Sequence, residues 1–167
     1  MIALRQATLD DLALIDDIHC RSRRATYRGL VSDHYLDVTM PAASRASWED
    51  KLPQVLAGGG CALVAENGGE AIGFACAQPV DGDGVVYLNN LHALPERKGR
   101  GVGTALLAEV ARHARSRGAR AMRLHVLASN APAIGFYESR GWRHTGDDTL
   151  EWAGQTVATR LYELALT

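Results

Sequence analysis

Lysine is scarce in this sequence: Lys51 and Lys98 are the only two among 167 residues, beside sixteen arginines. Neither lysine stands in a G-x-x-x-x-G-K-[ST] motif, which argues against the phosphate-binding loop of nucleotide hydrolases. The sequence also has no G-x-S-x-G motif, which weighs against a serine hydrolase of the α/β type. Its six histidines show no metal-ligand spacing, so we expect no metal site.

Long apolar runs are also missing, and none approaches the roughly 20 residues that a membrane helix needs. The first residues show no signal-peptide pattern. Cys20, Cys61 and Cys76 form no C-x-x-C pair and are odd in number, which is typical of buried thiols in a reducing compartment. The formal net charge of -1 offers no overall basic footprint. We therefore predict a cytoplasmic protein with neither a membrane nor a nucleic-acid partner.

The chain has the composition of an ordinary globular protein, with 47% hydrophobic and 22% charged residues. It shows no repeat and no linker, so we predict one domain over residues 1–167. Hydrophobic periodicity and turn residues predict strands, helices and an intervening loop with a short helix. The strands are expected at 2–7, 61–66, 71–77, 85–93 and 121–127, with two more in 142–166. The helices are expected after Thr8, at 42–56, from the glycine-rich turn to Gly118, and at 131–140, with the loop and short helix at 21–41.

This order of elements, β-α-α-β-β-β-α-β-α-β-β, predicts an α/β (α+β) fold in which helices flank one mixed sheet. Its most informative segment is the turn that contains Gly99, Gly101 and Gly103, between an expected strand and an expected helix. Glycines allow a ligand to approach the backbone closely, and a helix N-terminus presents unpaired N–H groups. Residues 97–123 hold eight basic side chains against Glu109 alone, a local charge of +7. The turn therefore predicts a phosphate-binding site.

A dinucleotide fold of the Rossmann type is the first interpretation of such a turn, and it fails on three counts. The third glycine of its fingerprint would fall at position 104, which is Thr104. The acidic residue expected about 20 positions later is missing, because Arg120 and Arg123 occupy that neighbourhood. Several strands also precede the turn, whereas the fingerprint follows the first strand of its domain.

Two motifs instead resemble the GNAT superfamily of N-acetyltransferases. The first is [Q/R]-x-x-G-x-[G/A]: Gly101 and Gly103 match it, and Lys98 stands where the family usually has arginine or glutamine. The second is N-x-x-A-x-x-x-Y-x-x-x-G-[F/W], which matches at Asn130, Ala133, Tyr137, Gly141 and Trp142. The motifs occur in the family's order, with one helix and one strand between them. The resemblance extends over essentially the whole chain.

The resemblance implies the single-domain GNAT fold, with a mixed, mostly antiparallel sheet of about seven strands and about four helices. It implies acetyl-CoA as co-substrate, no metal, and a bulge in the strand before the turn that admits the pantetheine arm. The cofactor-binding residues so implied are Leu91, His92, Ala93, Lys98, Gly99, Arg100, Gly101, Val102, Gly103, Thr104, Asn130, Ala133, Phe136 and Tyr137.

The family's chemistry implies that Tyr137 protonates the departing thiolate and that a backbone N–H near Leu91 polarises the acetyl carbonyl. Asn130 is the third implied catalytic position. The general base stays open, because Tyr87 and Asn89 occupy the positions where the family often has glutamate or histidine. On a regular strand His92 would face away from both of them. His92, His125 and a chain of water molecules remain as candidates for the base.

The expected activity is acetyl transfer to a primary amine of a small molecule, or of a peptide or protein N-terminus. Tyr27, Asp33, Tyr87 and Asn89 are the candidate acceptor-binding residues. The alternative is a sensor or regulatory module that binds coenzyme A without catalysis, as the missing base would allow. The resemblance also suggests a homodimer, for which Trp142 and Trp152 would be aromatic anchors on the last strands.

Overall fold

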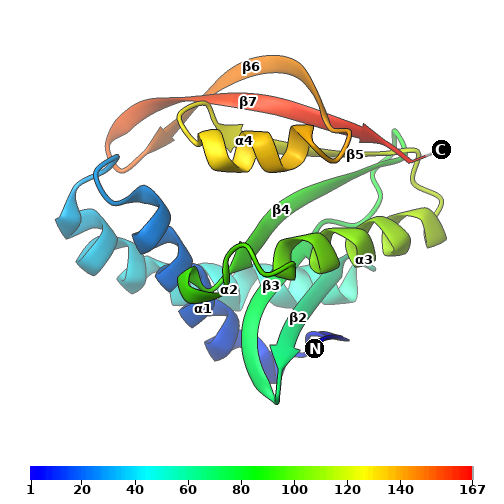
Figure 1. Cartoon of the computed structure of the whole chain (residues 1–167), viewed down its shortest axis with the longest axis horizontal. Helices are drawn as coiled ribbons and strands as arrows, with labels where there is room; N and C mark the ends of the chain where they lie inside the picture. The colour runs from blue at the N-terminus through cyan, green and yellow to red at the C-terminus, as the bar shows by residue number, and fades with distance from the viewer. Residues whose placement is uncertain (167) are drawn as a thin grey trace.

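The computed structural model describes residues 1–166 and contains one seven-stranded sheet in the order β1-β2-β3-β4-β5-β7-β6 (Figure 1). All neighbouring strands are antiparallel except β4 and β5, which are parallel. This is the mixed sheet of the expected fold, and the predicted order of elements is confirmed. The strands are β1 (Ile2–Gln6), β2 (Cys61–Asn67), β3 (Glu70–Ala77), β4 (Val85–Ala93), β5 (Ala121–Leu127), β6 (Arg143–Trp152) and β7 (Gln155–Ala165).

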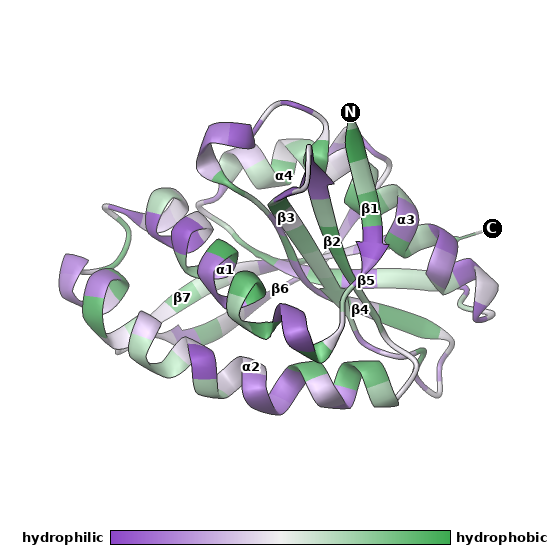
Figure 2. Ribbon diagram, turned by 90° about the horizontal axis from the view of Figure 1, so that it is seen from below, coloured by the Kyte–Doolittle hydropathy of each residue, from purple (hydrophilic) through white to green (hydrophobic). Residues whose placement is uncertain are grey.

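Four α-helices cover the two faces of the sheet: α1 (Leu12–Tyr27), α2 (Met40–Ala57), α3 (Val102–Ser116) and α4 (Ala131–Glu138). The apolar side chains of α1 and α2 pack with Val64 and Phe74 on one face. Those of α3 and α4 pack with Leu63, Leu88 and Leu124 on the opposite face. Figure 2 shows α1 and α2 on the near side of the strands, with α3 behind them. The sheet therefore separates two apolar layers.

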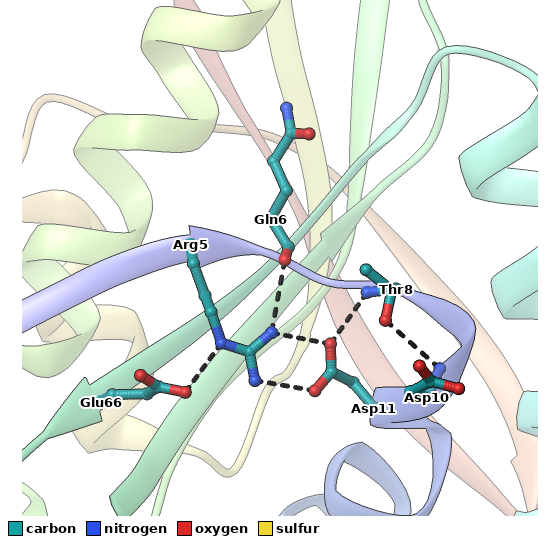
Figure 3. Close-up of polar contacts among 6 residues, drawn as sticks. All are labelled: Arg5, Gln6, Thr8, Asp10, Asp11 and Glu66. Atoms are coloured by element: carbon teal, nitrogen blue, oxygen red, sulfur yellow. Dashed lines mark hydrogen bonds and ion pairs between the residues drawn. The ribbon is translucent and has the colours of Figure 1, made fainter. Parts of the chain in front are cut away.

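The N-terminal strand is joined to the first helix by a polar network around Asp11 (Figure 3). Thr8 begins a short 3-10 helix (Leu9–Asp11) through a capping box in which its backbone N–H donates to the Asp11 carboxylate. Arg5 donates to both carboxylate oxygens of Asp11, at 2.7 and 2.8 Å, and to Glu66 on β2 at 2.7 Å. The Arg5 guanidinium is the main reason that the pKa of Asp11 lies below its usual value. The predicted cap at Thr8 is confirmed.

The largest difference from the expected elements lies in residues 21–41. The prediction of a loop from residue 21 is wrong, because α1 continues to Tyr27. A short connection then joins α1 to a π-helix (Tyr35–Thr39). Arg21, Arg23 and Arg24 are compatible with helix α1, because arginine stems can lie along apolar surface while their charged ends reach water. Cys20 on the same helix is buried with Leu36 and Met40. The helix is therefore stabilised by a small third apolar cluster.

The parallel strands β4 and β5 pair only over three residues, from Val85 opposite Ala121 to Tyr87 opposite Arg123. Beyond Tyr87 the strands diverge, as Figure 1 shows. The register of β4 against β3 shifts at the same place: Leu88 pairs with Ala77, but Asn90 pairs with Cys76. Asn89 is thus the extra residue of a β-bulge, the feature that the resemblance implied. A bulge bends its strand and changes the direction of the side chains that follow it.

The last two strands form a hairpin whose turn contains Ala153 and Gly154, both with positive φ. The predicted division of the tail at this pair is confirmed. Trp142 is buried in the core below α3 and α4, and Trp152 packs against Tyr27 and Tyr35 of the same chain. Trp142 is buried within the chain, so it is not free to be an anchor of a homodimer, whereas Trp152 is partly exposed. The homodimer itself stays a prediction. No helix within residues 1–166 has the length and hydrophobicity to span a membrane.

Candidate active site

A cavity of about 760 Å³ opens where β4 and β5 diverge. Its walls come from β4, the turn before α3, the beginning of α3, and α4, with contributions from α1, β5, β6 and β7. Most of the predicted site residues meet here, although they are up to 110 positions apart in the sequence. They are Tyr27, Asn89, Leu91, His92, Ala93, Lys98, Gly99, Gly101, Val102, Gly103, Thr104, Asn130, Ala133, Phe136 and Tyr137.

Three predicted residues do not line the cavity. Arg100 is exposed beside the glycine turn. Asp33 lies outside and accepts a hydrogen bond from Arg28 at 3.2 Å, so the prediction that it meets an amine is not supported. Tyr87 does not line the cavity itself, but its hydroxyl lies 2.6 Å from Nδ1 of His125, which does.

The glycine turn has the geometry of a phosphate cradle. Gly99 and Gly101 have φ angles of +76° and +85°, in the left-handed region that side chains rarely adopt. A Cβ atom added to either glycine would meet no atom within 4 Å. No side chain caps the N-terminus of α3, whose first backbone N–H groups follow Gly101. These open donors and the positive end of the helix dipole suit the pyrophosphate of coenzyme A.

Arg140 is a cavity residue that sequence reasoning missed. Its Nη2 donates to Thr104 Oγ1 at 2.6 Å, and its guanidinium carbon lies 3.7 Å from the centre of the Phe136 ring. Gly103 allows this approach of α3 and α4, because a Cβ there would lie 3.3 Å from Phe136. The spacing of Phe136 and Arg140, four residues apart on a helical pattern, was the available signal. Arg140 therefore places a positive charge beside the cradle.

The N-terminus of α4 fixes the position of Tyr137. Asn130 caps this helix by accepting a hydrogen bond from the Ala133 backbone N–H at 3.3 Å. Tyr137 packs edge-on against Phe136 and Trp142, and its hydroxyl has no hydrogen-bond partner within residues 1–166. A phenol of ordinary pKa carries its proton at neutral pH, and burial raises the pKa of Tyr137 further. A protonated phenol on the cavity wall is a suitable proton donor.

A second polar group comes from β4, β5 and β6 and reaches the cavity through His125. Leu124 and Val126 pack toward α3, so His125 between them faces the other side of the sheet. Its Nδ1 lies 2.6 Å from the Tyr87 hydroxyl, and its Nε2 lies 3.6 Å from Oδ2 of Asp148. The sequence could not assign these partners, because it did not show which residues of β4 and β6 flank His125.

The bulge corrects the expected direction of His92. Leu88 before the bulge and Leu91 after it both pack toward α3, although a regular strand would place them on opposite faces. His92 therefore lies on the same face as Tyr87, where its ring stacks on Phe74 and its Nδ1 is 2.9 Å from Ser22 Oγ of α1. Burial, with the nearby charges of Arg23, Lys98 and Lys51, lowers the pKa of His92 to about 3. His92 is therefore neutral, and it lies both under α1 and on the wall of the cavity.

We expect acid to destabilise the protein through this histidine and its neighbour His19, whose pKa is also lowered by burial. The unfolded chain binds these protons near pH 6.5 and the folded chain does not, so their contribution to stability is complete above that pH. Below it, each residue removes up to about 1.4 kcal/mol per pH unit from the free energy of unfolding. Urea unfolding between pH 7.5 and pH 4.5 measures this slope. His92→Asn should reduce it, whereas an equal slope in His92→Asn and in the exposed-site control His144→Asn would contradict the assignment.

Comparison with known proteins agrees with this geometry. Residues 24–142 match the acetyltransferase (GNAT) family. The chain is 29% identical over 169 residues to YuaI, an uncharacterized N-acetyltransferase of Bacillus subtilis, covering 99% of this chain and 92% of that protein. It is 36% identical over 109 residues to mycothiol acetyltransferase of Acidothermus cellulolyticus, covering 57% of this chain and 33% of that protein.

Among solved structures, the PaiA N-acetyltransferase of Thermoplasma acidophilum in complex with coenzyme A has a similar fold. Its TM-score is 0.82 at 21% sequence identity, and the comparison covers 99% of both chains. The predicted fold and the prediction of an acyltransferase enzyme are confirmed. Acetyl-CoA as its co-substrate agrees with both the family and the cradle. The chain belongs to the GNAT family of N-acetyltransferases.

Proposed function

We propose that this protein transfers the acetyl group of acetyl-CoA directly to a primary amine of a small molecule. The observation that carries the proposal is the placement of a neutral phenol, Tyr137, and a paired imidazole, His125, around one cavity. Acetyl transfer to an amine needs a base for the amine and an acid for the departing thiolate. When bound, acetyl-CoA supplies an acetyl group activated as a thioester.

His125 is the base in this proposal, with Tyr87 and Asp148 as its positioning partners. If the Nδ1–H of His125 donates to the Tyr87 oxygen, Nε2 keeps its lone pair and accepts a proton from the acceptor ammonium or amine. Asp148, 3.6 Å from Nε2, then stabilises the imidazolium. This arrangement fills the role of the base that Tyr87 and Asn89 could not fill themselves.

Tyr137 is the acid that protonates the departing thiolate in this proposal. As the new bond between nitrogen and the acetyl carbon forms, the bond between that carbon and sulfur breaks, and the Tyr137 hydroxyl gives its proton to the sulfur. The divergence of β5 leaves one edge of β4 without a strand partner from Leu88 to Ala93. Its backbone groups can therefore line the pantetheine arm and polarise the acetyl carbonyl near Leu91.

The acceptor end of the cavity favours a small amine over a peptide. The tip of the β6–β7 hairpin lies against the segment that joins α1 and α2 (Figure 1). Trp152 Nε1 donates to the Tyr35 hydroxyl at 2.7 Å, and Gln155 donates to the Leu30 carbonyl oxygen at 3.3 Å. These contacts hold the tip of the hairpin against the segment between α1 and α2, and we infer that they leave less room for an extended peptide. The relative named for mycothiol gives an example of a non-protein acceptor.

A panel of amines, amino acids, aminoglycosides and short peptides tests this proposal. Thiol release from acetyl-CoA, combined with mass spectrometry of the products, should detect turnover of a small primary amine. Turnover of peptides alone would contradict the acceptor class. Binding of acetyl-CoA with no turnover of any amine would instead support the sensor.

The cradle gives a direct prediction at Gly101. Gly101→Asp should weaken coenzyme A binding by about 10- to 100-fold, because a carboxylate would face the phosphates at the helix N-terminus. Gly101→Asn is the matched control, since asparagine has the same shape without the charge and tolerates a positive φ. Calorimetric titration of both variants separates charge from strain. Equal affinities in the two variants would place the phosphates elsewhere.

Arg140 gives a second binding prediction. Arg140→Gln removes the positive charge beside Thr104 and should weaken coenzyme A binding by about tenfold, the value of one charge-assisted hydrogen bond. Turnover at saturating acetyl-CoA should change little, because Arg140 lies by the cradle and away from His125. The control is Arg143→Gln, which alters an exposed arginine outside the cavity. An unchanged affinity in Arg140→Gln would limit this residue to packing on Phe136.

A further inference from the structure

A second cavity, of about 210 Å³, lies between α1 and α2 on the face of the sheet opposite α3. Two basic side chains line it, Arg23 from α1 and Lys51 from α2, together with the hydroxyls of Ser44 and Ser47. No aspartate or glutamate is among the lining residues within the described part of the chain. The cavity therefore combines two positive charges with neutral hydrogen-bond donors.

In the part of the chain that the structure describes, neither basic side chain of this cavity has a carboxylate partner, in contrast to seven arginines of the fold that form ion pairs. Arg5 and Arg28 each contact two carboxylates, whereas neither Arg23 nor Lys51 forms an ion pair within residues 1–166. Arg23 donates to Ser44 Oγ at 3.1 Å, and its Nε is buried without an acceptor. Lys51 lies 3.5 Å from Asn90 Oδ1 and 4.8 Å from the centre of the Trp48 ring.

Like charges in a partly buried cavity repel each other unless a negative charge compensates them. Burial lowers the pKa of Lys51, and the charge of Arg23 lowers it further. His19, which also lines this cavity, is neutral and adds no charge of its own. Its Nδ1 accepts a hydrogen bond from Trp48 Nε1 at 3.1 Å, and burial lowers its pKa. A doubly or singly charged oxyanion would receive charge-assisted hydrogen bonds from both side chains.

We propose that this cavity binds a small oxyanion, the carboxylate or phosphoryl group of a metabolite, between Arg23 and Lys51. Ser44 is the neutral donor nearest to the pair, since it already contacts Arg23. The proposal does not rest on the acetyl-transfer mechanism, because the cavity is separate from the one that holds Tyr137 and His125.

Calorimetric titration with malonate and with inorganic phosphate, at constant ionic strength balanced with chloride, tests this site. Saturating coenzyme A is present throughout, so that the cradle at Gly101 does not take up the added anion. We expect the wild type to bind at least one of the two probes at a single site. Binding of malonate alone would identify a carboxylate ligand, binding of phosphate alone a phosphoryl ligand, and binding of both the shared oxyanion chemistry.

Two variants and a control locate the binding. Lys51→Met and Arg23→Gln should each weaken binding of the anion by at least about tenfold. Arg45→Gln, which alters an exposed arginine of α2 that pairs with Glu49, should bind like the wild type. Unchanged coenzyme A affinity in all three variants shows that they are folded. The proposal is wrong if neither probe binds the wild type, or if both cavity variants bind as tightly as Arg45→Gln.

Discussion

Replacing Tyr137 by phenylalanine is expected to lower kcat by roughly 10²–10⁴-fold, the usual contribution of a general acid, and to leave KM for acetyl-CoA nearly unchanged. The substitution keeps the ring that packs against Phe136 and Trp142 and removes only the hydroxyl. That hydroxyl makes no hydrogen bond within residues 1–166, so the fold should lose little stability. Its proton matters most as charge develops on sulfur, which occurs in the transition state.

Steady-state kinetics with a turned-over amine measure this effect. The control is Tyr162→Phe, which removes a tyrosine hydroxyl that donates to Glu138 at 2.7 Å outside the cavity. This variant should lose stability rather than kcat. If Tyr137→Phe and the wild type turned over equally, Tyr137 would be a packing residue, and water or backbone donors would stabilise the thiolate.

His125→Gln is expected to lower kcat/KM for the amine by a similar factor, roughly 10²–10⁴-fold, because glutamine keeps polar contacts and cannot accept the proton. Coenzyme A affinity should be unchanged, since His125 lies on β5 rather than at the cradle.

The positioning partners of His125 provide the matched comparison. Tyr87→Phe leaves the imidazole in place and removes the group that orients Nδ1, so we expect a smaller loss of kcat/KM for the amine, of about tenfold. His92→Asn should lower kcat/KM for the amine far less than His125→Gln does, because His92 Nδ1 is held by Ser22 of α1. If His92→Asn lowered kcat/KM by roughly 10²–10⁴-fold and His125→Gln did not, the base would be assigned to the wrong histidine.

The elements and the cradle could be predicted because their determinants are local in the sequence. The bounds of β4 and β5 agree with the alternating runs at 85–93 and 121–127. Gly101 has the positive φ that the glycine spacing suggested. The end of α1 could not be predicted in this way, because its stabilisation depends on Leu36 and Met40, which reach Cys20 only through the tertiary fold.

The part of the site around His125 and His92 depends on the register between strands, and the sequence alone does not predict that register. One extra residue at Asn89 reverses the alternation of side chains along β4. His92 therefore lies on the same face as Tyr87, whereas a regular strand would place it on the opposite face. The pairing of β5 with β7, and of β7 with β6, brings Asp148 to His125. The sequence offered the histidine and tyrosine candidates of the site, but the register of β4 was needed to tell His92 from His125.

A crystal structure of the protein with coenzyme A tests the central claim most directly. We predict the pyrophosphate on the backbone N–H groups of residues 99–104, and the pantetheine arm along Leu91–Ala93 between β4 and β5. The thiol sulfur should lie within hydrogen-bond distance of the Tyr137 hydroxyl, on the side of the cavity that opens toward His125. A coenzyme bound outside the β4–β5 cavity, or a sulfur beyond the reach of Tyr137, would contradict the account.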